Sequence, residues 1–248
     1  MRKFVIVFLL GFAMTAQSSF LDEQKKYERV RTALKEKSEF VLKNLSNANI
    51  SMDNLNILFI AYKNEAVLEI YAKNKDEDFY KLLQQYDIMQ SSGDLGPKSA
   101  QGDKQVPEGF YYINRFNPSS NFYLSLGINY PNAADKLRSD AKDLGGDIFI
   151  HGSFVTVGCL PMSDDKIKEI YLYAMLAKNA AQAAIPVYIF PFRMNENNMS
   201  KFEKKYVDDK KLFTFWRNLK EGYDRFLGTK RELRFKFKKD GLYLFEKL

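Results

Sequence analysis

The chain has 248 residues, of which 46% are apolar, 28% charged and 15% aromatic. This composition is typical of a globular protein and excludes a wholly disordered, collagen-like or polytopic membrane chain. The sequence contains one cysteine, Cys159, and one histidine, His151, which excludes an intrachain disulfide framework and a zinc site built from several Cys and His residues.

The first 18 residues have the pattern of an export signal peptide. Arg2 and Lys3 precede an apolar run at residues 4–14, and small residues at positions 16 and 18 suit a signal peptidase. The run is shorter than the roughly 20 residues of a membrane span, and an uncleaved anchor is the alternative interpretation. We expect a periplasmic protein with no stable membrane span after removal of residues 1–18.

The formal net charge is +7, and removal of Arg2 and Lys3 would leave +5 (7 minus 2). This balance favours weak attraction to an anionic partner. Nucleic-acid binding is not expected, because the basic residues are interleaved with acidic ones and the protein is predicted to be exported.

Residues 19–50 are predicted to form an N-terminal helix. Apolar residues recur in it at helical spacing, with charged residues between them: Tyr27, Val30, Leu34, Val41 and Leu45. We expect this helix to pack on its own domain, and a homodimer through the helix is the alternative.

A strand-rich region follows the N-terminal helix. Two β-rich runs joined by residues 63–65 predict a hairpin, and a long Gly- and Pro-containing loop is expected at residues 91–109. That loop lacks the Gly-Lys-Ser/Thr sequence of a phosphate-binding loop. The predicted strands lie at residues 57–62, 67–71, 79–89, 110–113, 122–126, 147–151 and 187–190.

Helical spacing returns after Cys159. Ser163 is a candidate N-cap for one helix, a second is predicted at residues 212–226, and two short β runs flank residues 239–241. The pattern therefore predicts an α+β fold, a strand-rich single domain with helical additions at both ends.

His151 and Cys159 form a candidate catalytic pair. His151 ends a predicted strand and Cys159 precedes a predicted helix, so a short loop can bring imidazole and thiol together at one sheet edge. A neighbouring imidazolium lowers the pKa of a thiol, and the thiolate is the reactive nucleophile. The backbone at Gly158 can donate N–H groups to an oxyanion, and the carbonyl of Gly152 is a candidate to orient the base.

Each residue of this pair also has a structural interpretation. A cysteine is often a buried small hydrophobe, and a histidine at a strand end often satisfies local hydrogen bonds. Spacing alone leaves both interpretations open.

Several motifs shift the balance towards catalysis. The segment Ile150-His151-Gly152 and the segment Thr156-Val157-Gly158-Cys159 resemble the signature of the YkuD-type L,D-transpeptidase domain. Further segments resemble the YafK-like branch of that family, and the likeness extends over residues 52 to 248: residues 92–98, 101–103, 107–111, 129–132, 190–194, 215–216 and 219–224.

The resemblance implies a YkuD-like β-sandwich at residues 51–195, followed by a helical and β-hairpin extension at residues 196–248. It implies Cys159 as nucleophile, His151 as general base, the Gly152 carbonyl as the group that orients it, and Gly158 as an oxyanion donor. It also carries over four candidate substrate-binding residues, whose alternative role is to brace loops: Lys98, Asp103, Thr156 and Arg193. No metal or cofactor is expected, since covalent cysteine catalysis needs none.

Two positions depart from the broad family. Val157 stands where a second histidine is usual, and Pro161 stands where an arginine is frequent. The loop from His151 to Cys159 is also shorter than in the broad family. The YafK-like branch shares all three of these features. The missing side chains line the donor site in the broad family, so the resemblance leaves the substrate and the acyl acceptor open.

The implied substrate is the stem peptide of peptidoglycan. The leading hypothesis is an L,D-transpeptidase, in which a thioester at Cys159 passes to an amine. The alternatives are a hydrolase of the same bond class, either a carboxypeptidase or an amidase that releases a wall-linked lipoprotein, and a non-catalytic peptidoglycan-binding module.

Overall fold

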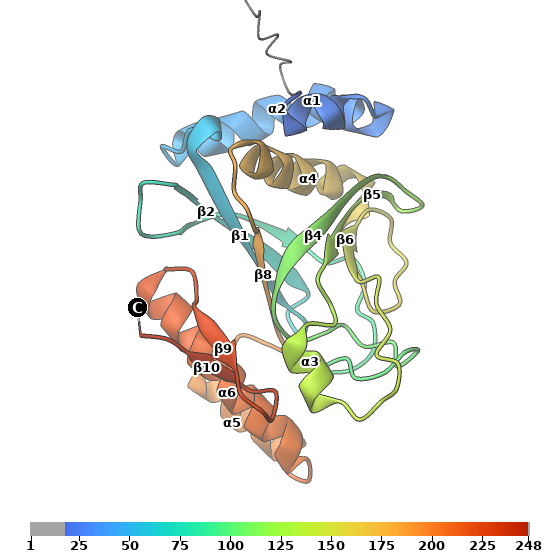
Figure 1. Ribbon diagram of the computed structural model, residues 1–248, viewed down its shortest axis with the longest axis vertical. Coiled ribbons are helices and arrows are strands. Elements are labelled where there is room, and N and C mark those ends of the chain that lie inside the picture. The colour runs from blue at the N-terminus through green and yellow to red at the C-terminus, as the bar shows by residue number, and fades with distance from the viewer. Residues whose placement is uncertain (1–17, 248) are drawn as a thin grey trace, which may run out of the picture.

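The computed structural model describes residues 18–247 (Figure 1). The expected signal peptide lies outside the described residues except for Ser18. Within residues 18–247, no helix is both long enough and apolar enough to span a bilayer.

An eight-stranded sheet in the order β3-β2-β1-β8-β4-β5-β6-β7 forms the centre of the molecule. Its β1–β8 and β6–β7 pairs are parallel and the others are antiparallel. The strands are β1 (Leu55–Tyr62), β2 (Val67–Asn74), β3 (Lys81–Asp87), β4 (Gly109–Ser120), β5 (Tyr123–Ile128), β6 (Phe149–His151), β7 (Leu160–Pro161) and β8 (Pro186–Phe190).

Strand β4 belongs to both halves of this sheet. Its first residues, Gly109 to Tyr112, pair with β8, and the part from Ile113 onwards pairs with β5 through two irregularities in register. Such irregularities bend a strand and increase its twist. The sheet therefore curls, with β1, β2 and β8 on one side and β5 and β6 on the other (Figure 1).

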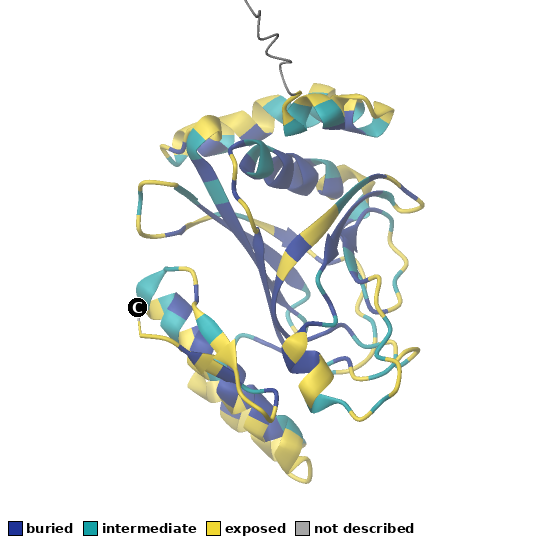
Figure 2. Cartoon of the chain, viewed as in Figure 1, coloured by how far each residue is buried: buried dark blue, intermediate teal, exposed yellow. Residues whose placement is uncertain are grey.

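Period-two alternation divides the apolar side chains between two cores. Along β1, Leu55, Ile57 and Phe59 enter one core, whereas Leu58 and Ile60 enter the other. Because successive side chains of a strand point to opposite faces, both faces of the central strands need a covering layer. Figure 2 shows these strands buried, and most of the exposed residues on the outer helices and loops.

Helices cover one face of the sheet. Helix α4 (Ser163–Asn179) packs next to it, and α1 (Phe20–Lys25) and α2 (Glu28–Asn47) pack on α4 (Figure 1). The C-terminal elements supply the second core, on the other face: α5 (Glu196–Lys205), α6 (Lys210–Thr229), β9 (Phe235–Phe237) and β10 (Tyr243–Phe245). The remaining elements are a short 3-10 helix, η1 (Met52–Asn54), and α3 (Ala133–Arg138).

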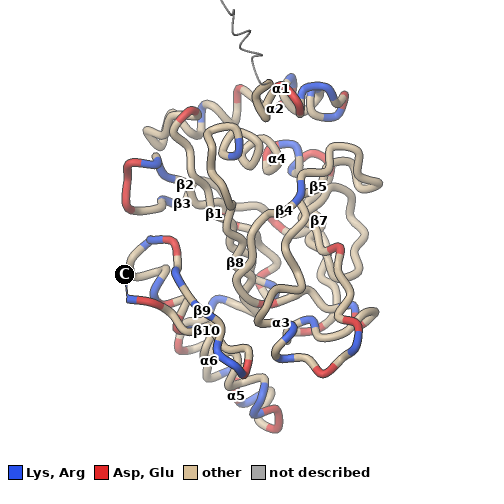
Figure 3. Tube along the Cα trace, viewed as in Figure 1, with Lys and Arg blue, Asp and Glu red and all other residues tan. Residues whose placement is uncertain are grey.

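The fold class is confirmed: the structure is a strand-rich α+β domain with helices at both ends. The hairpin at residues 57–71 is confirmed as β1 and β2, and the long loop contains no helix or strand from residue 88 to residue 108. Helix α4 begins at Ser163, so the N-cap position belongs to Met162 and not to Ser163 as predicted; the Ser163 hydroxyl accepts a hydrogen bond from the Lys166 N–H. Basic and acidic residues lie close to one another along α1, α5 and α6 (Figure 3).

The predicted N-terminal helix is in fact two helices. Tyr27 is extended and separates them, because Gln24 of α1 is buried against α4, where it accepts a hydrogen bond from the Tyr171 hydroxyl. Arg31 of α2 donates to the carbonyls of Lys25 and Lys26 at the break. The apolar face of α2 packs on α4 of its own chain, so that a homodimer through these helices would have to use another of their faces.

Candidate active site

Strands β6 and β7 bring the two candidate catalytic residues to one edge of the sheet. In this parallel pair His151 lies opposite Pro161 and Ile150 opposite Leu160, so that Cys159 comes level with Phe149. The thiol accepts a hydrogen bond from the Phe149 N–H at 3.4 Å and donates to the Asp147 carbonyl at 3.6 Å. Since residues 149 and 151 point to the same face of β6, thiol and imidazole lie on one face.

The backbone holds His151 on both sides. Its own carbonyl accepts the Met162 N–H, and its Nδ1 lies 2.5 Å from the carbonyl oxygen of Gly152. A carbonyl can only accept, so Nδ1 carries the proton and Nε2 has a free lone pair. The ring of Phe122 covers the imidazole, with 4.6 Å between the ring centroids.

Hydroxyl groups hold the backbone of the Cys159 loop. Thr156 accepts the Cys159 N–H at 3.0 Å and donates to the Cys159 carbonyl at 2.8 Å. Ser92, from the long loop, accepts the Gly158 N–H at 2.9 Å. The N–H of Gly158, which is expected to bind an oxyanion, and the N–H of Cys159 therefore already have hydroxyl partners.

Gly158 has a backbone conformation that favours glycine. Its φ of +83° is one that side-chain-bearing residues rarely adopt, and a Cβ here would lie 3.1 Å from the Gln105 carbonyl oxygen. Glycine at this position therefore allows the loop to turn next to the thiol.

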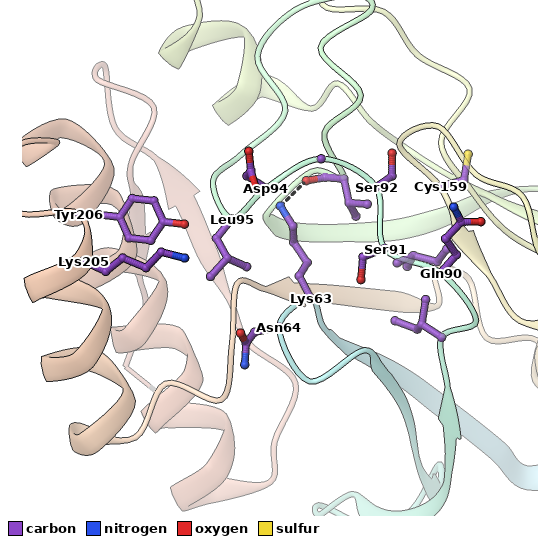
Figure 4. Close-up of a pocket in the computed structure, with 14 residues that line it drawn as sticks. Lys63, Asn64, Gln90, Ser91, Ser92, Asp94, Leu95, Cys159, Lys205 and Tyr206 are labelled. Carbon is purple, nitrogen blue, oxygen red and sulfur yellow. Dashed lines mark hydrogen bonds between the residues drawn. The ribbon is translucent and has the colours of Figure 1, made fainter.

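Two cavities meet at Cys159. The first, of about 480 Å³, is lined by His151 and Cys159 together with Phe122, Thr156 and Val157. The second, of about 240 Å³, lies between the long loop and the end of α5 and also reaches Cys159 (Figure 4). His151 lines the first cavity and not the second.

Burial sets the protonation of the pair. It raises the pKa of the Cys159 thiol above its ordinary value, more than the Phe149 N–H and the Lys98 charge lower it. Burial also lowers the pKa of His151. We expected an imidazolium to lower the thiol pKa; the structure instead favours a neutral thiol beside a neutral imidazole, because desolvation penalises both charged forms.

The buried Lys98 forms an ion pair at 2.6 Å with Asp103, which is half-buried. Asp103 also accepts the N–H groups of Ser99, Ala100 and Gln105, which fixes the fold of the long loop. Both residues line a third cavity, of about 410 Å³, that does not reach Cys159. In the structure both residues stabilise the fold of the loop, and the positive charge of Lys98 lowers the pKa of the Cys159 thiol without contacting it.

Arg193 lies away from the thiol. Its guanidinium pairs with Glu69 of β2 at 2.6 Å and lies over the Tyr62 ring. It lines neither of the cavities that contain Cys159. Of the four candidate substrate-binding residues, the structure therefore brings only Thr156 next to the pair.

Sequence reasoning missed several residues that shape the site. Ser92 contacts the Cys159 loop, and Glu108 accepts hydrogen bonds from Lys63, Gly96 and Trp216 beside the second cavity. Ser92 and Glu108 both lie in segments that resemble the YafK-like branch, so the resemblance pointed to these segments but assigned no role to either residue. Phe122 had no signal beyond its position in a predicted strand.

The sequence matches the L,D-transpeptidase catalytic domain family, YkuD, over residues 57–189. The chain belongs to this family, and the match includes both His151 and Cys159. It is 38% identical over 172 residues to "Putative L,D-transpeptidase YafK" of Escherichia coli strain K12 and to the protein of the same name from strain O157:H7. Each alignment covers 68% of this chain and 66% of the relative, so the chain spans slightly less than two thirds of these proteins.

Two solved structures are similar to this chain at lower sequence identity. The helical cell shape determining protein Pgp2 from Campylobacter jejuni is 17% identical, with a TM-score of 0.45 and coverage of 74% of each chain. Bd1075 from Bdellovibrio bacteriovorus is 20% identical, with a TM-score of 0.40 and coverage of 69% of this chain and 62% of that one.

Proposed function

We propose that this protein is a periplasmic cysteine acyl-transfer enzyme of the L,D-transpeptidase type that acts on the stem peptides of peptidoglycan. The observation that carries the proposal is the shared cavity of Cys159 and His151. The Gly152 carbonyl accepts a hydrogen bond from Nδ1 of His151, so that Nε2 is free to accept a proton.

The reaction begins from the neutral pair. As Sγ of Cys159 attacks the carbonyl carbon at the L-centre of a diamino acid, its proton passes to Nε2 of His151. The imidazolium then gives this proton to the leaving amine, and a thioester remains on Cys159. In the second half-reaction an acceptor amine attacks the thioester and loses its proton to Nε2, which regenerates the thiol when the thioester breaks.

The oxyanion of each tetrahedral intermediate needs donors. We assign this role to the N–H groups of Gly158 and Cys159, whose present partners are the neutral hydroxyls of Ser92 and Thr156. A hydrogen bond to an ionised oxygen is roughly twice as strong as one between neutral groups. An oxyanion would therefore displace or share these hydroxyl contacts at low cost.

A hydrolase of the same bond is the second candidate, and the lining of the His151 cavity favours it. Among the described residues that line this cavity, the charged one is Asp147, which pairs with Arg115 at 2.7 Å. The lining has no cation to hold the carboxylate of an amino-acid acceptor, and Val157 stands where the broad family usually has a second histidine. Water could then take the place of the acceptor amine, which would give a carboxypeptidase or an amidase that detaches a lipoprotein from the wall.

Defined muropeptides, with and without a linked lipoprotein peptide, test the proposal. We expect a thioester on wild-type protein by intact mass, and no thioester on Cys159→Ala. Cross-linked products would support the transpeptidase, and free stem peptides alone would support the hydrolase. Wild-type protein that binds muropeptides without acylation or turnover would contradict both and leave a non-catalytic binding module.

A further inference from the structure

The peptide group that binds the His151 imidazole is itself bound at its other end. The Gly152 carbonyl, which accepts the Nδ1 proton of His151, belongs to the peptide group that joins Gly152 to Ser153. The N–H of the same peptide group donates to the Asp164 carboxylate at 2.7 Å. A trans peptide group is planar, with its C=O and N–H on opposite sides. The carboxylate therefore fixes the direction in which the carbonyl points.

This peptide group needs an external partner to keep its orientation. Ser153 has a φ of +65°, a left-handed conformation that residues with a side chain rarely adopt. Gly152, on the other side of the peptide group, has the rotational freedom of glycine. The Ser163 N–H binds the Ser153 carbonyl, which belongs to the next peptide group along the chain. Among residues 18–247, the partner of the Ser153 N–H is Asp164.

The carboxylate lies directly against Gly152. A Cβ at Gly152 would lie 2.6 Å from Oδ1 of Asp164 and 2.7 Å from the Phe122 carbonyl oxygen. Helix α4 and residue 122 thus enclose Gly152 from two sides. Asp164 lies in the first turn of α4, where the helix dipole favours a negative charge. The helix therefore holds an ionised carboxylate on the peptide group that the imidazole contacts.

The charge of Asp164 reaches the imidazole through the peptide group. Asp164 is exposed, so that water screens its direct field, and it forms no salt bridge with any residue between 18 and 247. A carboxylate on the N–H polarises the peptide group, which makes its carbonyl oxygen a better acceptor. This favours the imidazolium that forms when Nε2 of His151 takes the thiol proton.

We propose that Asp164 is a positioning residue that acts on His151 through the Gly152–Ser153 peptide group. The proposal rests on the proposed function, in which Nε2 of His151 exchanges the proton. The carboxylate keeps the Gly152 carbonyl on Nδ1, and Nε2 therefore stays free for the thiol proton. Asp164 lines neither of the cavities that contain Cys159, so its effect is on the base and not on the substrate.

The rate of acylation tests the proposal. Thioester formation with a defined muropeptide is followed by intact mass over a range of peptide concentrations. Asp164→Ala should lower the maximal rate about tenfold, because a misplaced base slows proton transfer, and leave the half-saturating concentration within about twofold. Asp164→Asn keeps an oxygen that accepts the Ser153 N–H and loses the charge, so it should lower the rate only about threefold.

The single histidine of the chain gives a second measurement that needs no substrate. Protein labelled with ¹⁵N-histidine contains one imidazole, and its ¹⁵N NMR spectrum shows which ring nitrogen carries the proton. At about pH 8 an ordinary imidazole is neutral, and wild type should carry the proton on Nδ1. Asp164→Ala should show a mixture of both tautomers, and Asp164→Asn should restore the wild-type tautomer. A smaller folded fraction alone would not change the tautomer of the folded protein.

Asp165→Ala is the matched control. Asp165 also lies in the first turn of α4 and is exposed, but it pairs with Lys37 at 2.7 Å. Asp165→Ala should retain the wild-type acylation rate and the wild-type tautomer.

Three results would overturn the role of Asp164. The first is acylation by Asp164→Ala at the wild-type rate. The second is a slower Asp164→Ala whose imidazole keeps the proton on Nδ1, and the third is an Asp164→Asn that is as slow as Asp164→Ala. If wild-type protein forms no thioester, the proposed function fails, whereas the tautomer of Asp164→Ala still decides whether the carboxylate positions His151.

Discussion

The buried carboxylate of Glu108 gives the sharpest stability prediction. Its side chain is fully buried and accepts hydrogen bonds from Lys63 at 2.9 Å, Gly96 N–H at 2.7 Å and Trp216 at 2.8 Å. Glu108→Ala would leave the Lys63 ammonium without its counter-ion, although only 6% of the Lys63 side chain is exposed. Removing one partner of a buried ion pair costs about 3 to 5 kcal/mol.

The assay is urea unfolding of wild type and variant, followed by Trp216 fluorescence. For a domain of this size the expected loss corresponds to a fall of about 6 to 20 °C in unfolding temperature. Glu203→Ala is the control, because the pair of Glu203 with Arg217 is exposed, and it should change stability by less than about 0.5 kcal/mol. The residue 91–108 loop should also become more sensitive to protease, since Glu108 holds Gly96.

A loss below about 1 kcal/mol for Glu108→Ala, or a loss equal to that of Glu203→Ala, would refute this reasoning. It would mean that Lys63 finds water or another acceptor when the carboxylate is removed. The role of Glu108 as the link between hairpin, loop and α6 would then be wrong.

The remaining predictions concern the site and helix α6. Cys159 should react with iodoacetamide at pH 7 more slowly than free cysteine does, and the rate should increase as the pH rises, because burial raises the pKa of the thiol. A rate that no longer changes with pH near pH 7 would instead indicate a thiolate–imidazolium pair. His151 must be neutral to accept a proton, and burial lowers its pKa. The midpoint of the acid limb of the kcat/KM profile should therefore lie below the ordinary histidine pKa of 6.5, and a midpoint above 6.5 would contradict this protonation scheme. Thr156→Val should slow acylation about tenfold, whereas Thr156→Ser should not; equal rates would show that the hydroxyl does not position Cys159. Gly222→Ala should destabilise the protein by about 1 to 3 kcal/mol in urea unfolding, because its Cβ would lie 2.5 Å from the Phe110 ring. Gly228 has open space around it, so Gly228→Ala should be neutral or stabilise the protein by up to about 1 kcal/mol. Destabilisation by both variants, or by neither, would refute the packing argument.

Local patterns predicted the parts of the fold that local chemistry determines. Runs of β-branched and aromatic residues identified β1, β2 and β8, and the presence of one cysteine and one histidine directed attention to the loop between them. The break at Tyr27 was not predictable, because it depends on a contact between Gln24 and Tyr171, which are 147 positions apart. Helix α5 was also missed, since its charged residues outnumber the few apolar ones that reach the core.

The same limit applies to the candidate site. His151 ends β6, and Cys159, eight positions later, directly precedes the neighbouring strand β7, so the short connection brings them close together. Ser92 reaches Gly158 from 66 positions away, and nothing in the spacing of either residue indicates that contact. Lys98 and Arg193 carry the charges that a substrate carboxylate would attract, yet each has an acidic partner in the fold, and charge alone does not reveal such pairing.

The order of strands in the sheet has a consequence for folding. Strand β8 lies between β1 and β4 at the centre of the sheet, although it comes last in the chain among the eight strands. Until residues 186–190 are in place, the chain can form two separate half-sheets, β3-β2-β1 and β4-β5-β6-β7, each with an unpaired edge where β8 belongs. Unpaired edges are templates for aggregation, and pairing β1 with a strand more than 120 positions away is slow. Arrival of this one strand joins the half-sheet that carries His151 and Cys159 to the half that supports the second cavity, so the last strand to be inserted also completes the site.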